Sequence, residues 1–157
     1  SLVGSEMCIR DRTSLFYMGR GVDYAQALEA SLKMKEIAYL HSEAYAAGEL
    51  KHGTIALVEP GTQVIALATQ PALLAKMAAN IHEVRSRGAR VLALAARSLS
   101  EGLRGEADEI WTIPDTEPLL TPLLGIVPMQ LLAYETALAR GCDVDKPRNL
   151  AKSVTVE

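Results

Sequence analysis

Short apolar runs alternate with longer segments of mixed polarity along this chain. The run SLFYMG at residues 14–19 leads into Gly19-Arg20-Gly21, a pattern typical of a strand that ends in a tight turn. The segment from Val22 to Leu40 has the length and the Ala and Leu content of a helix. Further apolar runs predict strands at TIALVEPG (54–61), TQVIALAT (62–69), RVLALAA (90–96) and EIWTIP (109–114).

Two more helices are predicted. The evidence is residues that typically begin or end helices, together with the helical spacing of apolar residues between them. Pro71 can begin a helix and Gly88 can end it. A last helical region is predicted from about Leu119 to Arg140, interrupted at Pro128. The apolar positions that repeat at helical spacing in the first of these segments are Leu73, Leu74, Met77, Ile81 and Val84.

This alternation of strands and helices indicates an α/β fold with a parallel sheet and helices on both of its faces. In such sheets ligands bind beyond the carboxyl ends of the strands, where the Gly19-Arg20-Gly21 turn is expected. The turn lacks the third glycine of a dinucleotide-binding fingerprint, so we interpret it as structural.

The composition is that of one ordinary domain. The chain has 157 residues, of which 49% are apolar, enough to bury a sizeable core. Its net charge of −3 and its scattered Lys and Arg residues give no support for nucleic-acid binding. Cys8 and Cys142 are too few for a disulfide framework and too far apart for a zinc motif, so we expect a cytoplasmic protein.

The most apolar segment is LLTPLLGIVPMQLLAYETALA, residues 119–139. Two prolines, Gln130 and Glu135 interrupt it, which predicts a buried helix pair rather than a membrane span. No secretory signal is recognised near the first residue, because Arg10 and Arg12 follow the short N-terminal stretch instead of preceding an apolar run.

The predicted helix at 22–40 carries an unusual charged stripe. At about 100° per residue, Glu29, Lys33 and Glu36 share one narrow arc at spacings that bring them into contact. Apolar residues lie on both sides of this arc, including Leu28 and Leu32 on one side, so we expect a largely buried helix. The stripe is either a salt-bridge ladder facing water or a lysine and a carboxylate in a cleft. In a cleft, burial and charge would bring their pKa values toward neutrality.

A second group of polar residues lies in the segment EAYAAGELKHG, residues 43–53. Glu49, Lys51 and His52 crowd between two glycines, and the simplest interpretation is a polar loop. His41 and Glu43 form an H-x-E pattern, but the P-C-x-x-C half of a zinc deaminase signature is missing, which favours a structural role.

Three segments together resemble one family. ALEASLKMKEIAYLHSEAYAAGELKHG (27–53), VPMQLLAYETALARG (127–141) and DVDKPRNLAKSVTVE (143–157) are similar to the glucosamine-6-phosphate synthases, the isomerising glutamine–fructose-6-phosphate aminotransferases. In that family a glutaminase domain precedes two sugar isomerase (SIS) domains. This chain resembles the second SIS domain, which implies a five-stranded parallel sheet between helices in a three-layer α/β/α sandwich.

The resemblance implies a set of site residues. It makes Glu36 the acid–base that moves a proton between C1 and C2 of the sugar, assisted by Lys33. Lys152 is the amine that forms a Schiff base at C2, and Glu36 and Lys152 contact substrate together with Ala151. His52 is implied to open the sugar ring in the active site of a neighbouring subunit. Glu29 and Lys51 are the supporting residues of this set.

The resemblance also sets the expected partners. They are fructose 6-phosphate or glucosamine 6-phosphate and a second copy in a homodimer, with no cofactor, metal, nucleic acid or membrane. Residues 1–12, SLVGSEMCIRDR, are expected to be foreign to the fold, with residues 13–157 forming the SIS domain. The glutaminase domain and the first SIS domain, to which the phosphate-binding loop belongs, are absent from this sequence. The chain alone is therefore expected to bind fructose 6-phosphate weakly and not to make glucosamine 6-phosphate.

Two other functions remain open. SIS folds also serve as non-catalytic sugar-phosphate sensors, and related SIS enzymes act as deglycases or deaminases. Thr54 is a departure from the family pattern, which commonly has proline after KHG, but it removes no catalytic group.

Overall fold

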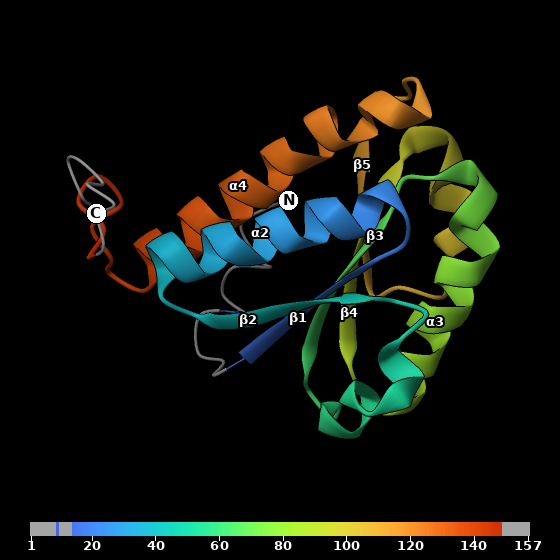
Figure 1. Ribbon diagram of the computed structural model, residues 1–157, viewed down its shortest axis with the longest axis horizontal. Helices are drawn as coiled ribbons and strands as arrows, with labels where there is room; N and C mark the ends of the chain where they lie inside the picture. The colour runs from blue at the N-terminus through green and yellow to red at the C-terminus, as the bar shows by residue number, and fades with distance from the viewer. Residues whose placement is uncertain (1–8, 10–13, 149–157) are drawn as a thin grey trace, which may run out of the picture.

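The fold is built on a sheet of five parallel strands in the order β2-β1-β3-β4-β5. The computed structural model (Figure 1) describes Ile9 and residues 14–148, and the predicted α/β class is confirmed. The direction of the strand order reverses between β1 and β3, at the middle of the sheet. The strands are β1 (Ser14–Gly19), β2 (His41–Ala46), β3 (Gln63–Ala68), β4 (Arg90–Ala96) and β5 (Glu109–Ile113).

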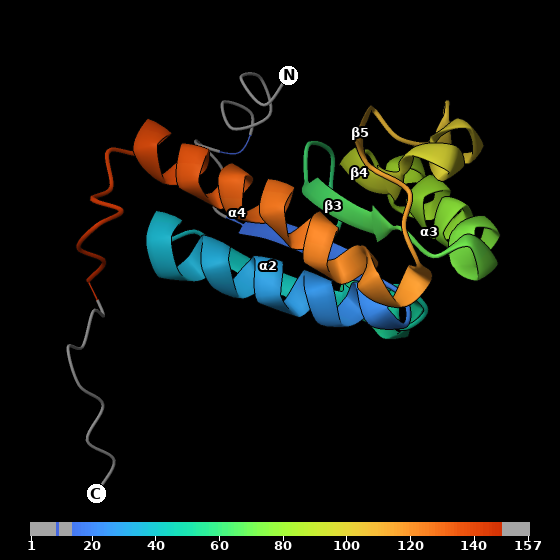
Figure 2. The same cartoon turned by 90° about the horizontal axis from the view of Figure 1, so that it is seen from above.

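Helices cover both faces of this sheet. Helices α2 (Val22–Ala38) and α4 (Thr121–Ala139) run side by side along one face (Figure 2), and α3 (Leu74–Ser86) covers the other. Successive strand residues point to opposite faces, so Leu15 and Tyr17 join the α2–α4 side while Phe16 and Met18 join the α3 side. The 3-10 turns are η1 (Leu50–His52), η2 (Thr54–Leu57), η3 (Pro71–Leu73), η4 (Arg97–Leu103) and η5 (Pro118–Leu120).

One strand prediction fails and one strand was not predicted, both in the same region. The run at 54–61 is not a strand but the turn η2 and the loop after it, with Ile55 and Val58 buried over the α3 side of the sheet. The strand in this region is instead β2, whose sequence HSEAYA looks polar because β2 is an edge strand with most side chains partly exposed.

Helix α4 corrects the expectation of a buried helix pair. It is one continuous helix in which Pro128 is accommodated without a break. Its inner side is buried through Met129, Leu132 and Ala133, whereas its outer side exposes several large apolar residues. By length and composition, 118–139 is the one stretch of the described residues that could span a membrane, and here it forms a layer of the sandwich.

Helix α2 is buried on one side only. Ala27, Ala30 and Met34 are fully buried against the sheet and α4, but Leu28 and Leu32 are 47% and 41% exposed. The prediction of a largely buried α2 is therefore wrong, because one of its two apolar sides faces outward. Of the expected foreign segment only Ile9 is described, and it is buried on the α2–α4 side of the sheet.

Candidate active site

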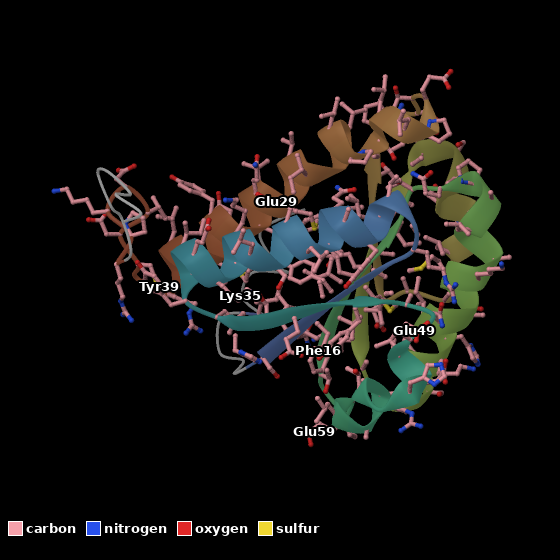
Figure 3. All side chains as sticks on the ribbon, in the orientation of Figure 1. Phe16, Glu29, Lys35, Tyr39, Glu49 and Glu59 are labelled. Carbon is pink, nitrogen blue, oxygen red and sulfur yellow. The ribbon has the colours of Figure 1, made fainter. Side chains whose placement is uncertain are left out.

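The charged stripe on α2 forms the contacts that its spacing predicts. The Lys33 Nζ atom donates a hydrogen bond to Glu36 Oε2 at 2.8 Å and lies 3.4 Å from Glu29 Oε1. The side chains of Glu29, Lys33 and Glu36 are 45%, 31% and 33% exposed, so the stripe is accessible without being fully hydrated. Figure 3 labels Glu29 near the middle of α2. One ammonium group thus bridges two carboxylates at a partly sheltered surface.

The bridge fixes the charge of Lys33. Its hydrogen bond to Glu36 raises the pKa of Lys33 above the usual 10.5, while burial opposes that effect only in part. Of the two alternatives for the stripe, the one in which a cleft brings the pKa of this lysine toward neutrality is not supported, because that pKa shifts in the opposite direction. Lys33 is a permanent cation near pH 7, suited to holding a carboxylate in place and to donating a hydrogen bond, and it is unsuited to acting as a base.

The ELKHG segment lies in the loop that follows β2. His52 is in the turn η1, with its side chain 75% exposed and Nε2 3.8 Å from Glu49 Oε2. Lys51 Nζ lies 3.5 Å from Glu83 Oε2 of α3, so Lys51 ties this loop to the body of the domain. The arrangement presents an imidazole to the outside of the chain, on a loop that is anchored at Lys51.

Glu36 of the stripe and the ELKHG loop lie toward opposite ends of β2. Figure 3 shows Tyr39, just after α2, far from Glu49, which begins the His52 turn. Six residues of strand separate these two ends, a length of about 20 Å at 3.3 Å per residue. Within one chain the structure does not bring His52 together with Glu36. Each chain therefore presents two separate groups of candidate residues.

A buried network at the carboxyl ends of the strands was not predicted from the sequence. Asp23, 1% exposed, accepts hydrogen bonds from the Thr69 backbone N–H at 2.8 Å and from Thr69 Oγ1 at 2.5 Å. Thr69 Oγ1 also lies 2.9 Å from Thr121 Oγ1, at the start of α4. Burial raises the pKa of Asp23, although the Thr69 hydrogen bonds lower it in part. The sequence signal was an acidic residue in the first turn of a helix.

The Gly19-Arg20-Gly21 turn comes directly before this network in the chain. A Cβ at Gly19 would clash with the Asp23 backbone, so the tight turn requires glycine there. The Asp23 carboxylate lies at the helix N-terminus, where an anionic ligand would bind. Arg20 is engaged with Asn80 through a hydrogen bond of 3.0 Å. The described contacts of Gly19 and Arg20 thus lie within the domain, and the interpretation of the turn as structural stays a prediction.

The other candidates take structural positions or lie outside the described residues. Ala151 and Lys152 belong to the part of the chain that the structure does not describe. His41 Nε2 lies 3.5 Å from Glu43 Oε1, and Glu43 also accepts a hydrogen bond from Tyr45. Within residues 14–148 no three His, Cys, Asp or Glu side chains gather in a group that could hold a metal ion.

Comparison with known proteins identifies the family. The family model described as SIS domain matches residues 8–140, most of the chain. This chain belongs to the SIS domain family. It is 63% identical over 143 residues to the isomerising glutamine–fructose-6-phosphate aminotransferase of Caldanaerobacter subterraneus subsp. tengcongensis. That match covers 91% of this chain but 23% of the relative, so the SIS domain here spans about a quarter of that protein's length.

Solved structures show the same fold. The C-terminal domain of the glucosamine-fructose-6-phosphate aminotransferase from Francisella tularensis superimposes with a TM-score of 0.87 and 33% identity, covering 92% of this chain and 41% of that one. The glucosamine-6-phosphate deaminase of Thermotoga maritima gives a TM-score of 0.73 at 27% identity, covering 99% of this chain and 46% of that one. The five-stranded SIS sandwich implied by the sequence resemblance is confirmed.

Proposed function

We propose that this SIS domain is the C-terminal part of an isomerising glutamine–fructose-6-phosphate aminotransferase and carries the residues that isomerise the sugar. The observation that supports this most directly is the 63% identity over 143 residues to an enzyme of that name. The contact of Lys33 with both Glu29 and Glu36 supports it independently, because it provides a carboxylate held by a permanent cation. A cytoplasmic location belongs to the same proposal, since phosphorylated sugars are too polar to cross membranes freely.

The proposed chemistry assigns one role to each group. His52 moves the proton that opens the ring of fructose 6-phosphate. The Lys152 amine then bonds to C2, and the carbonyl oxygen leaves as water. Ammonia derived from glutamine displaces Lys152 and leaves an imine at C2. Ala151 contacts the substrate beside Lys152.

Isomerisation then moves one proton between neighbouring carbons. The Glu36 carboxylate takes a proton from C1, the C1–H electron pair forms a C1–C2 double bond, and the π pair of the C2=N imine moves to nitrogen, which takes a proton. Glu36 returns its proton to C2 while the C1 hydroxyl loses its own, giving an aldehyde at C1 and an amine at C2. Lys33, oriented by Glu29, holds Glu36 in position throughout.

A homodimer in which His52 completes the partner's site is part of this proposal. The separation of the ELKHG loop from the α2 stripe along β2 supports it, because one chain does not bring the two groups together. Lys51 supports the loop through its ion pair with Glu83. The exposure of His52 leaves its imidazole free to enter another subunit.

Replacement of Glu36 tests the isomerase role. In the full-length protein, Glu36→Gln should abolish conversion of fructose 6-phosphate to glucosamine 6-phosphate while glutamine hydrolysis and sugar binding persist. The matched control is Glu59→Gln, which removes an exposed carboxylate in the turn before β3 and should leave the rate unchanged. Full activity of Glu36→Gln would overturn the role, and a wild-type protein that binds the sugar without any turnover would be a sensor instead.

Mixing two inactive variants tests the shared site. If His52 acts across a two-fold dimer, random pairing of His52→Ala with Glu36→Gln subunits restores about a quarter of the wild-type sites, because half the dimers contain one intact site. If His52 acts within its own subunit, every site keeps one defect and no activity returns. The mixture therefore separates the two arrangements directly.

A deaminase is the second candidate, favoured by the 27% identical Thermotoga maritima structure. Such an enzyme releases ammonia from glucosamine 6-phosphate and needs no glutamine. Assaying the full-length protein with glucosamine 6-phosphate alone, and with fructose 6-phosphate plus glutamine, distinguishes them. Glutamine-dependent formation of the amino sugar supports the synthase, and ammonia release without glutamine-dependent synthesis supports the deaminase.

A further inference from the structure

The loop that carries His52 leaves the sheet beside the turn that follows β1. The Ala47 backbone N–H donates to the Gly19 carbonyl oxygen at 2.9 Å, so β1 and β2 stay paired up to their last residues. Gly48 comes next in the chain, and His52 follows it by four positions. Arg20, the residue after Gly19, therefore lies next to the point where the His52 loop begins.

The Arg20 side chain occupies the space beside Gly48. A Cβ placed on Gly48 would lie 3.1 Å from Nη2, 3.2 Å from Nη1 and 3.4 Å from Cζ of Arg20. These distances are shorter than the best separation of two nonbonded atoms, so the guanidinium lies directly against the backbone of the loop. The φ of Gly48 is not positive, so alanine could adopt its backbone conformation. What residue 48 provides is the missing side chain, which makes room for Arg20.

Helix α3 holds Arg20 in this position. Asn80 of α3 is 5% exposed, and its Oδ1 accepts a hydrogen bond from Arg20 Nε at 3.0 Å. The rigid guanidinium thus donates from Nε to α3 while its terminal nitrogens lie against the loop. Glu83, one helical turn beyond Asn80, pairs with Lys51 of the same loop at 3.5 Å. One side of α3 therefore supports the loop at both Gly48 and Lys51.

We propose that Arg20 is a positioning residue that links the His52 loop to Asn80 of α3 and so holds the His52 imidazole where it opens the sugar ring. This inference rests on the proposed function, in which His52 moves the ring-opening proton. The His52 side chain is 75% exposed, and its Nε2 lies 3.8 Å from Glu49 of the same loop. The loop backbone therefore sets the position of the imidazole. A displacement of about 1 Å in such a group can lower a rate about 100-fold.

A substrate that has no ring to open separates this role from a general loss of structure. Because O6 carries the phosphate, fructose 6-phosphate closes its ring through the C5 hydroxyl, and the analogue without that hydroxyl stays in the open-chain form. The full-length protein is assayed with each sugar plus glutamine, and the amino sugar is measured by mass spectrometry. A defect in ring opening slows the first reaction and leaves the second unchanged.

Arg20→Gln should lower kcat with fructose 6-phosphate about tenfold and should leave the rate with the open-chain analogue unchanged. His52→Ala should show the same selectivity with a larger loss, about 100-fold, because the imidazole itself is removed. Gly48→Ala should act like Arg20→Gln, since the added methyl group displaces the guanidinium. It keeps the test valid if Arg20→Gln folds poorly.

Conservative variants and a control test the contact itself. Asn80→Asp keeps the acceptor for Arg20 Nε and should retain most of the activity, whereas Asn80→Leu should not. Arg20→Lys keeps the charge but has a single nitrogen in place of the fork, so it should not restore the rate. The matched control is Arg104→Gln, which removes an exposed ion pair with Glu101 and should leave both reactions unchanged.

Amide hydrogen exchange of residues 47–53 measures the loop without any turnover of sugar. Exchange should be faster in Arg20→Gln and Asn80→Leu than in the wild type and in Arg104→Gln, because the loop opens more often when its link to α3 is lost. This measurement decides the test if the wild-type protein does not convert the open-chain analogue.

Two kinds of result would overturn the inference. Unchanged exchange in Arg20→Gln, or equal slowing of both sugars by that variant, removes the positioning role and leaves the proposed function intact. If His52→Ala slows both sugars equally or slows neither, His52 does not open the ring, and the proposed role of His52 is removed together with the inference.

Discussion

Lys33 is the residue whose replacement separates the two interpretations of the α2 stripe. A partly exposed ion pair contributes little to stability, so Lys33→Met should change the free energy of unfolding by less than about 1 kcal/mol. If Lys33 holds Glu36 for proton transfer, the same change should lower isomerase turnover about 100-fold. Urea denaturation and the rate of glucosamine 6-phosphate formation in the full-length protein measure the two effects.

The matched control is Lys35→Met, two positions along the helix, where the side chain is exposed and Figure 3 shows it well away from Glu29. It should leave both quantities unchanged. Equal activity of Lys33→Met and Lys35→Met would mean that the stripe is a salt-bridge ladder and nothing more.

Residue-level prediction from sequence succeeded where the interaction was local. The contacts of Lys33 follow from spacings of three and four positions on a helix, which the sequence contains in full. The raised pKa of Lys33 depended on one short hydrogen bond, and spacing alone did not reveal it. The Asp23 network joins residues 23, 69 and 121, which come together only when the sheet forms. Lys152, placed by resemblance alone, stays a prediction.

At the scale of elements, local pattern identified every strand that is buried inside the sheet. Strands β1, β3 and β4 are apolar on both faces, so their sequences differ clearly from helices and loops. Edge strand β2 has a mixed pattern, and η2 has an apolar one because it covers the α3 side of the core. What decides these two cases is tertiary position, at the sheet edge for β2 and over the core for η2, and a local window of sequence does not contain it.

Pro128 offers a test of how α4 is held. Proline inside a helix removes one backbone hydrogen bond and crowds the preceding turn, yet α4 continues through it. Packing of the inner side of α4 against α2 and the sheet therefore outweighs the local cost. Pro128→Ala should stabilise the domain by about 1 to 3 kcal/mol, less the entropy that proline removes from the unfolded chain.

Chemical denaturation of the isolated chain measures this change, with Ala139→Gly at the end of α4 as a control that should be mildly destabilising. A loss of stability in Pro128→Ala would show that the proline side chain contributes to the packing of α4 by more than its local cost.

At the scale of the whole molecule, stability should depend on pH through Asp23, which links α2, β3 and α4. Burial raises the pKa of Asp23 in the folded state above its ordinary 3.8. The contribution of Asp23 to the free energy of unfolding is therefore fully present below the pKa that Asp23 has in the unfolded chain. It is lost as the pH rises through the pKa that Asp23 has in the folded protein. Asp23→Asn, which can still accept from the Thr69 N–H, should gain stability relative to wild type between pH 3 and pH 7.

Asp115 should show the opposite dependence and serves as the comparison. Hydrogen bonds from Ser98 lower the pKa of Asp115, so its contribution is present above the ordinary carboxyl pKa and is lost as pH falls. Asp115→Asn should therefore be less stable than wild type at pH 7 and should approach it in acid. Parallel urea titrations across this range measure both variants, and the same pH dependence in the two would contradict the assignment.

The outer side of α4 is a large exposed apolar surface, and we expect it to make the isolated domain self-associate. Large apolar side chains recur there every three or four residues, and Leu123 is 68% exposed. Contiguous apolar patches of this kind on a lone domain mark surfaces that another molecule covers. The sedimentation coefficient of the isolated chain should rise with concentration, and Leu123→Glu with Leu131→Glu should suppress that rise. Leu57 is 60% exposed on η2, so Leu57→Glu adds one charge elsewhere on the surface and should not suppress the rise.

If the double variant associates as strongly as wild type, the contact lies on another face. If the double variant also lowers the stability of the full-length protein, the outer side of α4 is covered there by the rest of that chain.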